Sequence, residues 1–319
     1  MANVHRLGDY QNNNNQNNNY GRPQFGGQPR VNNAFQQQPL LGGGGGNVQY
    51  VNPRQESFFD MLKFTFCPSF TIFSFIFFIT LIDVLIYITT LIATGAKGYP
   101  LDNDNFLGPS VITLNQFGSN NPFRMRYDIQ LWRFFTPIFL HAGFMHIFSN
   151  MLSQMIIGFM LESIMGPFRV GLLYLVSGIG GNLFSALCAP DKLSVGASTS
   201  IFGLLACLLS LVLVNWKALD RSPEVRCCLI IFVIFLFLFS LLMAFSSQEN
   251  TVDVFGHLGG FLSGFFFGTI VMIHMRGQEA RVRMSYEKIC QIVGIVGVSI
   301  FFVLCFSLFY TVVHPRFQL

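Results

Sequence analysis

Seven apolar stretches follow one another from residue 70 onward, and most are about 20 residues long, enough to cross a hydrocarbon core of about 30 Å. Because a backbone in lipid must satisfy its hydrogen bonds internally, such stretches are expected to be helices. In agreement, 52% of the residues are hydrophobic and 11% are charged, against about a quarter charged in soluble domains. The sequence therefore predicts an all-α polytopic membrane protein. The stretches lie at 70–93, 144–164, 169–188, 198–215, 228–245, 254–274 and 289–313.

The chain divides into three predicted parts. Residues 1–55 hold asparagine, glutamine and glycine tracts with few aliphatic residues, so we expect a disordered head. Residues 56–275 carry the first six apolar stretches and are predicted to form a six-helix core. Residues 276–319 add a loop, a seventh transmembrane helix and a short tail. The fourth and fifth stretches are short, and a half-length helix that starts at membrane depth indicates a cavity there.

The lysines and arginines predict the orientation of the chain. With a cytosolic N-terminus, most of the 19 basic residues fall on the cytosolic side, as the positive-inside rule requires. The N-terminal ends of the fourth and sixth stretches then face the lumen or the cell exterior. We expect a multi-pass protein of the plasma membrane or of a secretory-pathway (Golgi or endosomal) membrane. The net charge of +4 is too small to indicate nucleic-acid binding.

Ser198 and His257 are polar residues inside apolar stretches, and glycines flank both. A polar group kept at membrane depth is a functional-site hypothesis, because burying it unpaired is costly. Serine is a weak nucleophile and needs a base, and a neutral histidine can accept its proton. Taken singly, Ser198 could be a helix N-cap and His257 a packing histidine. A stripe of Gly260, Gly264 and Gly268 would let the two helices approach closely.

Other residues are expected to surround this pair. The turn after Gly196 leaves helix N–H groups, including that of Ser198, free to stabilise an oxyanion. Phe202 lies one turn after Ser198 and could pack against the imidazole. His146 and Asn150 share a helix face and could donate hydrogen bonds into the same site.

Metal binding by His141, His146 and His257 is the rival interpretation. No carboxylate lies near these residues in the sequence, and the residue four positions after His146 is an asparagine, a poor ligand. We therefore expect neither a metal nor another cofactor.

Two acidic residues are assigned structural or solvated positions. Glu162 lies near the cytosolic end of its helix, too far from Ser198 to act on it, and is expected to bond the loop that follows. Asp253, four residues before His257, is expected to be solvated at the membrane edge. A Ser–His dyad fits this pattern better than a triad.

These residues, in this order, resemble the rhomboid intramembrane serine proteases over roughly residues 70–275. The motifs are Trp132-Arg133, His141 with His146 and Asn150, Ser-Gly-Ile-Gly-Gly-Asn (177–182), Gly196-Ala-Ser198 and His257-Leu-Gly-Gly260. The resemblance implies Ser198 as nucleophile and His257 as base, with His146, Asn150 and Gly196 around the oxyanion. Supporting residues would be Phe202, Gly260, Trp132, Arg133 and Glu162. The helix after the six-helix core is similar to that of secretase-type members.

The resemblance also implies the substrate class. Rhomboid proteases cleave transmembrane segments, here of single-pass proteins near the lumenal or extracellular face of the bilayer. The family usually has glycine directly after the serine, where this chain has Thr199, and we expect the β-branched side chain to crowd the substrate cleft. The alternative is a weak or inactive relative that binds transmembrane clients and controls their trafficking. A transporter is a more distant alternative, since the chain shows no repeated half.

Overall fold

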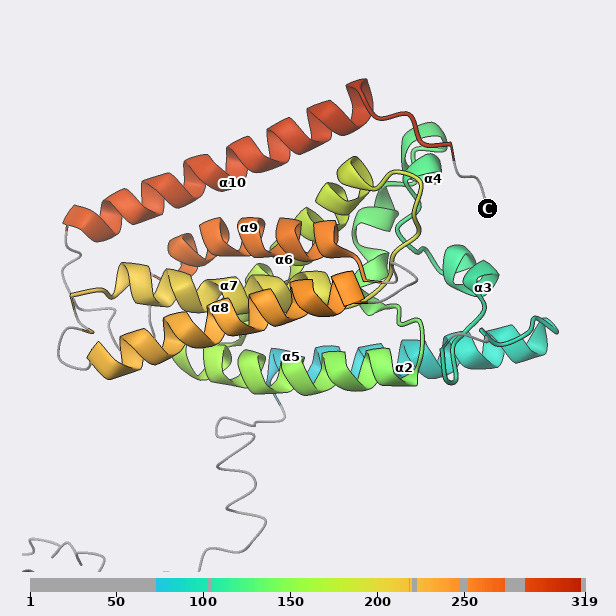
Figure 1. The fold of residues 1–319 in the computed structure, drawn as a ribbon, viewed down its shortest axis with the longest axis horizontal. Helices are drawn as coiled ribbons and strands as arrows, with labels where there is room; N and C mark the ends of the chain where they lie inside the picture. The colour runs from blue at the N-terminus through green and yellow to red at the C-terminus, as the bar shows by residue number, and fades with distance from the viewer. Residues whose placement is uncertain are drawn as a thin grey trace, which may run out of the picture. The chain divides into compact units, whose positions relative to one another are not determined.

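The computed structural model describes residues 73–102, 105–217, 219, 223–246, 252–272 and 285–316. Within these ranges the regular elements are all helices, and β pairing is confined to two isolated bridges (Figure 1). The prediction of an all-α polytopic protein is therefore confirmed. The predicted disordered head at 1–55 and the whole loop at 276–284 lie outside the described residues.

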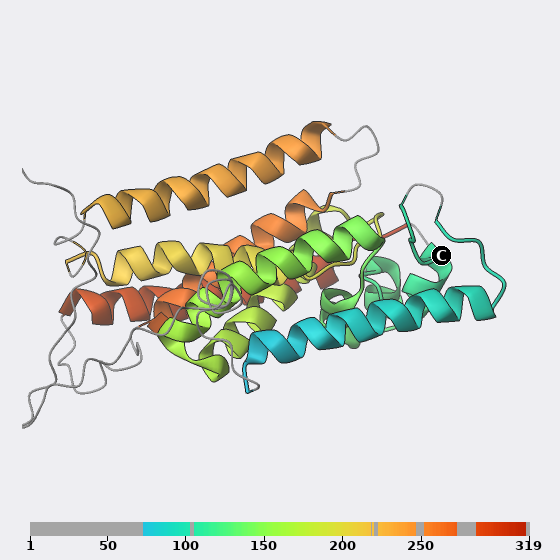
Figure 2. The ribbon, with the colours of Figure 1, turned by 90° about the horizontal axis from the view of Figure 1, so that it is seen from below.

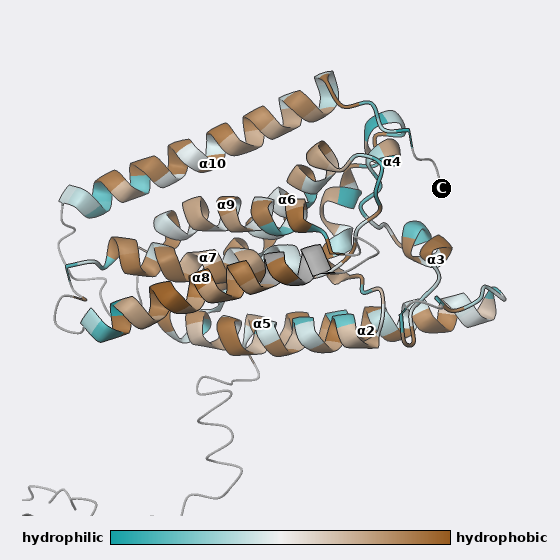
Figure 3. Cartoon of the chain, viewed as in Figure 1, coloured by the Kyte–Doolittle hydropathy of each residue, from teal (hydrophilic) through white to brown (hydrophobic). Residues whose placement is uncertain are grey.

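Five of the described helices are long and apolar enough to cross a membrane. They are α2 (Phe75–Ala96), α5 (Phe144–Met165), α6 (Pro167–Cys188), α9 (Val254–Val271) and α10 (Ser285–Thr311). Large apolar side chains on these helices face outward, and the hydrophobic colouring follows the long helices in Figure 3. This outward apolar surface suits a bilayer.

Two further helices correspond to the fourth and fifth stretches. α7 (Ser198–Val214) has 17 residues, so it is short as expected. α8 (Pro223–Ser246) has 24 residues and is not short, contrary to our prediction. The helix begins at Pro223, five residues before the predicted apolar stretch at 228–245. Proline suits the first turn of a helix because its missing N–H is not needed there. α7 lies at the centre of the bundle against α5, α6, α8 and α9 (Figures 1 and 2).

Glycines bring α7 and α9 into backbone contact. A Cβ on Gly260 would collide with the Thr199 carbonyl oxygen, and one on Gly264 would collide with the Gly203 Cα. A Cβ on Gly268 would lie 2.7 Å from the Ser210 hydroxyl. Small residues thus set the separation of the two helices, in line with the role of such stripes in membranes.

The segment between α2 and α5 folds into four short helices. Arg133, only 4% exposed, ties this segment together by donating to Asn115 Oδ1, to the Asn115 carbonyl and to the Ser119 carbonyl. Burial lowers the pKa of Arg133 to about 10, so the guanidinium stays protonated at neutral pH. The helices are α3 (Val111–Gln116), α4 (Pro122–Tyr127), η1 (Leu131–Phe134) and η2 (Thr136–Phe139).

α10 packs along α9 and α6, and its C-terminal end is bound to loops near the N-terminus of α7. Arg126 Nη1 of α4 donates to the Phe309 carbonyl over 2.7 Å. After the helix ends, the Arg316 N–H donates to Asp191 Oδ1 over 2.7 Å. Asp191 belongs to the loop that precedes Ser198, so the segment after α10 is bound to this loop.

Glu162 binds the N-terminus of α2. Its carboxylate accepts hydrogen bonds from the Ser74 hydroxyl at 2.9 Å and from the N–H groups of Phe75 and Ile76 at 3.2 and 3.1 Å. We predicted that Glu162 would bond the loop that follows its own helix, and for the Glu162 side chain this prediction was wrong. The first N–H groups of a helix lack partners and carry partial positive charge, which attracts a neighbouring carboxylate.

Candidate active site

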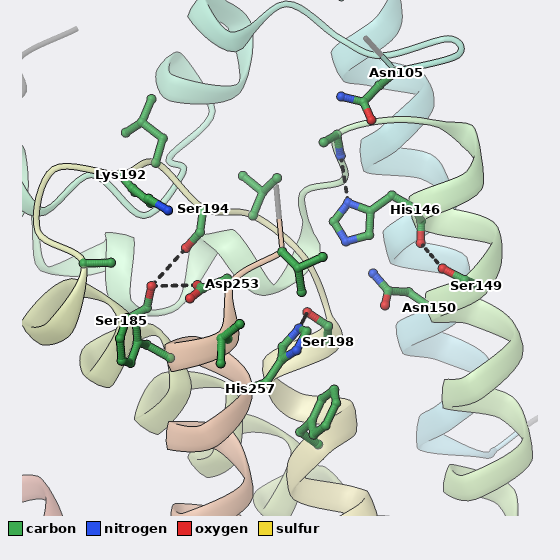
Figure 4. Close-up of a pocket in the computed structure, with 18 residues that line it drawn as sticks. Asn105, His146, Ser149, Asn150, Ser185, Lys192, Ser194, Ser198, Asp253 and His257 are labelled. Atoms are coloured by element: carbon green, nitrogen blue, oxygen red, sulfur yellow. Dashed lines mark hydrogen bonds between the residues drawn. The ribbon is translucent and has the colours of Figure 1, made fainter. Parts of the chain in front are cut away.

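Ser198 and His257 are hydrogen-bonded to each other in the structure. Ser198 is the first residue of α7, and His257 lies in the first turn of α9. The Ser198 Oγ and His257 Nε2 atoms are 2.9 Å apart (Figure 4). The close α7–α9 packing brings together two side chains that are 59 residues apart in sequence.

Gly196 makes the sharp turn that precedes Ser198. Its φ of 139° lies in a region that side chains rarely adopt. A Cβ at this position would lie 2.8 Å from His146 Nε2 and 3.4 Å from Ser198 Oγ. The Gly196 N–H donates to the Pro137 carbonyl at 2.9 Å, which holds the turn against η2. Glycine is therefore required both by the backbone conformation and by the space in front of the serine.

His146 presents a donor nitrogen to this turn. The Ala142 N–H donates to His146 Nδ1 at 3.3 Å, so a neutral imidazole must carry its proton on Nε2. That nitrogen faces the backbone at Gly196.

Asn150 lies one turn further along α5 and, like His146, lines a cavity beside Ser198. It is 7% exposed, and its side-chain Nδ2 has no hydrogen-bond partner within the described ranges. Two donors from one helix face therefore point at the region in front of Ser198 (Figure 4).

Phe202 stacks on His257. The ring centroids are 4.3 Å apart and the planes are 12° from parallel. Phe202 also contacts Phe237 of α8 edge to face, at 6.2 Å between centroids. The imidazole is thus held on one side by a residue of the same helix that carries Ser198.

A cavity of about 720 Å³ opens beside Ser198 and His257. Its polar lining includes Asn105, His146, Ser149, Asn150, Lys192 and Asp253 (Figure 4).

Asp253 is held by protein donors. Its Oδ1 accepts from the Gly256 N–H at 2.8 Å and its Oδ2 from the Ser185 hydroxyl at 2.6 Å. Asp253 is partly exposed, as expected at the membrane edge, but it also has these protein partners, which were not expected. Sequence analysis also missed Ser185 and Lys192 as lining residues, because contacts between loops and helices leave no local pattern. An aspartate at the start of a helix, one turn before a histidine, was the available signal for Asp253.

His141 is fully buried beside His146. The two rings meet edge to face with centroids 5.4 Å apart. Burial lowers the pKa of His141 well below its usual range, so this imidazole is neutral. Among the described residues, no three histidine, cysteine or acidic side chains gather as a possible metal site.

Three predicted supporting residues lie apart from the cavity. Trp132 is 56% exposed, and Arg133 binds the loop at Asn115 and Ser119. Glu162 binds the start of α2. Gly260, by contrast, lies directly behind Ser198, where α9 meets the backbone of residue 199.

Thr199 points into the helix bundle, not into the cleft. It is 4% exposed, and a Cβ on Gly181 of α6 would lie 2.6 Å from the Thr199 Cβ. The expectation that Thr199 crowds the substrate cleft was therefore wrong. The next residue of a helix is turned by about 100° from Ser198, which directs it toward α6 and α9.

Comparisons with known proteins show similarity to rhomboid proteins. Residues 128–274 match the family model of the rhomboid domain. "RHOMBOID-like protein 1" of Arabidopsis thaliana is 40% identical over 174 residues, 54% of this chain and 43% of the relative. "Rhomboid-like protease 1" of Toxoplasma gondii is 33% identical over 204 residues, 64% of this chain and 65% of the relative. "Inactive rhomboid protein 1" of Danio rerio is 36% identical over 187 residues, 58% of this chain and 20% of the relative.

The chain spans less than two thirds of the length of each of these relatives. The matched region contains η1, α5 to α9 and every residue of the cavity beside Ser198 except Asn105. These matches support a rhomboid-family, intramembrane protease-like protein, and the five long apolar helices support an integral membrane protein.

Proposed function

We propose that the protein is an intramembrane serine endopeptidase that cleaves transmembrane segments of single-pass proteins near the lumenal or extracellular face. The observation that carries this proposal is the 2.9 Å contact between Ser198 Oγ and His257 Nε2 at the edge of a cavity. A nucleophile within hydrogen-bond distance of its base is the arrangement that acyl transfer needs.

In the first half of the reaction, Ser198 Oγ attacks the scissile carbonyl carbon while its proton passes to His257 Nε2. The carbonyl oxygen becomes negative and is stabilised by His146 Nε2–H, Asn150 Nδ2 and the Ser198 N–H. The C–N bond then breaks, and His257 gives the proton to the leaving amine.

In the second half, water from the cavity attacks the acyl-enzyme. His257 accepts a proton from the water and returns it to Ser198 Oγ as the acid product leaves. The same oxyanion donors act again in this step.

The buried position of the site determines which substrates fit. A peptide bond inside a helix has its carbonyl paired, so the substrate helix must unwind before attack. Substrates should therefore begin their transmembrane helix with glycine, proline or other weak helix formers. We further propose a cytosolic N-terminus, and residence in the plasma membrane or a secretory-pathway membrane, because the lysines and arginines concentrate on that side.

A serine-reactive fluorophosphonate and a single-pass reporter substrate test the proposal together. Ser198→Ala and His257→Ala should each abolish cleavage, and the double variant should be no worse, because the two residues act as one unit. Probe labelling should disappear in Ser198→Ala. The exposed Ser163 provides the control, since Ser163→Ala should label and cleave normally. Cleavage retained in Ser198→Ala would contradict the proposal.

The similarity to a relative named as inactive supports one alternative, a protein that binds transmembrane clients and controls their trafficking. The two functions separate in the same assay. A client binder would retain the reporter in co-purification while producing no cleavage and no probe labelling in the wild-type protein.

A further inference from the structure

Asp253 is a carboxylate fixed at the edge of the cavity beside the dyad. It caps the N-terminus of α9, where its Oδ1 accepts from the Gly256 N–H at 2.8 Å. Its Oδ2 accepts from the Ser185 hydroxyl of α6 at 2.6 Å. Both oxygens are thus held by donors from different helices, which fixes the position of the negative charge (Figure 4).

The carboxylate lies one helical turn before His257. The His257 N–H donates to the Asp253 backbone carbonyl at 3.0 Å, so the two residues share the first turn of α9. Because its oxygens are occupied by Gly256 and Ser185, Asp253 acts as a fixed charge.

No other carboxylate is found among the described residues that line the cavity. The other charged lining residue is Lys192, whose positive charge opposes the formation of an imidazolium nearby. His257 becomes an imidazolium each time it takes the Ser198 proton. In a site of low dielectric constant, a fixed negative charge stabilises that cation more than it would in water.

The geometry points to Asp253 as a positioning residue for the dyad: it holds the first turn of α9 so that His257 Nε2 faces Ser198, and its charge stabilises the imidazolium formed during attack. This inference rests on the proposed peptidase function. The proton moves from Ser198 Oγ to His257 Nε2 and then to the leaving amine, and Asp253 takes part in neither transfer. Ser185 contributes by fixing the carboxylate.

An isosteric substitution of Asp253 separates the effect of its charge from its role as the N-cap of α9. Asp253→Asn keeps the shape and an oxygen acceptor for Gly256 while removing the charge. With full-length protein in liposomes and a single-pass reporter, we expect kcat to fall about tenfold with KM within about twofold of wild type. Fluorophosphonate labelling of Ser198 should slow in proportion. Asp253→Glu, which restores the charge, should recover more activity than Asp253→Ala.

Two further variants complete the design. Ser185→Ala keeps the charge but frees the carboxylate, so kcat should fall less than in Asp253→Asn. The control is Asp128→Asn, which removes an acidic residue paired with Arg124 outside the cavity and should leave kcat unchanged. Thermal unfolding of each variant checks the fold.

The outcomes separate this inference from the proposed function. An unchanged kcat in Asp253→Asn, with cleavage abolished in Ser198→Ala, overturns the role of Asp253 and leaves the peptidase intact. A change confined to KM also overturns it. If Asp253→Asn does not fold, the comparison of Asp253→Glu with Asp253→Ala replaces it. Equal losses of kcat in these two variants would contradict a role of the charge. Cleavage that persists in Ser198→Ala instead removes the peptidase itself.

Discussion

The Phe202 ring lies nearly parallel to the His257 imidazole at a centroid distance of 4.3 Å. Phe202 is on α7, one turn after Ser198, whereas His257 is on α9. The helix that carries the proposed nucleophile therefore also carries the surface on which the base rests. A shift of α7 along α9 would move Ser198 and Phe202 together relative to His257, so it would disturb the 2.9 Å contact and the ring stacking at the same time.

Phe202→Leu should lower kcat by about tenfold, because the imidazole loses its stacking partner and samples other orientations. KM should change little. Cleavage kinetics on a single-pass reporter measure both constants. Phe148→Leu serves as the control, because Phe148 is 56% exposed on α5. Equal kcat values for the two variants would contradict an orienting role for Phe202.

Asn150→Ala should lower kcat by about 100-fold, the usual effect of removing one oxyanion donor. Substrate affinity should be retained, because the interaction strengthens only in the transition state. Single-turnover kinetics with the same reporter provide the test. A normal turnover rate would mean that the unpaired Nδ2 of Asn150 only fills space.

Gly196→Ala should remove cleavage while the protein still folds. The added Cβ would press on His146 Nε2 and would hold alanine at a φ of 139°. Gly95→Ala is the matched control, since a Cβ there meets nothing within 4 Å. Activity assays and thermal unfolding in detergent distinguish the two. Full activity in Gly196→Ala would show that this turn can relax away from His146.

Thr199→Gly should destabilise the protein without changing its specificity. Loss of the buried side chain and the added backbone freedom at the start of α7 should together cost about 1–2 kcal/mol. Thr199→Val should be neutral or stabilising, because the Thr199 hydroxyl has no partner within the described ranges. Thermal unfolding measures the stability of both variants. A library of substrates that differ in the residue before the cleaved bond measures the specificity. A changed cleavage profile in Thr199→Gly would place residue 199 in the substrate cleft after all.

Glu162→Gln should lower the free energy of unfolding by about 1–2 kcal/mol, because the start of α2 loses a charged acceptor. The folded fraction should keep its kcat, since Glu162 lies away from the cavity. Thermal unfolding and active-site titration with the fluorophosphonate measure the two quantities separately. An unchanged melting temperature would show that neutral acceptors suffice at this helix start.

Hydropathy predicted the helices well, and helical spacing predicted which residues share a face. The glycine stripe at 260, 264 and 268 predicted the α7–α9 contact, because small residues at this period allow close packing in lipid. The proximity of Ser198 and His257 followed from their similar depth in the membrane.

Side-chain directions set by tertiary packing could not be predicted. Whether Thr199 faces the cleft or the bundle depends on the rotation of α7 against α6, which no local pattern encodes. The partner of Glu162 is 86 to 88 residues away. The contact of Asp253 with the Ser185 hydroxyl could not be predicted, because Ser185 is 68 residues away in the sequence.

The contacts at the end of α10 also bear on the order of events during protein synthesis. The loop before Ser198 is bound by the Arg316 N–H through Asp191, and α4 is bound by the Phe309 carbonyl through Arg126. A growing chain that has just inserted α9 already contains Ser198 and His257 but lacks both contacts. These contacts can form only when residues 309–316 have emerged from the ribosome, so the surroundings of the dyad are completed only after α10 has been translated.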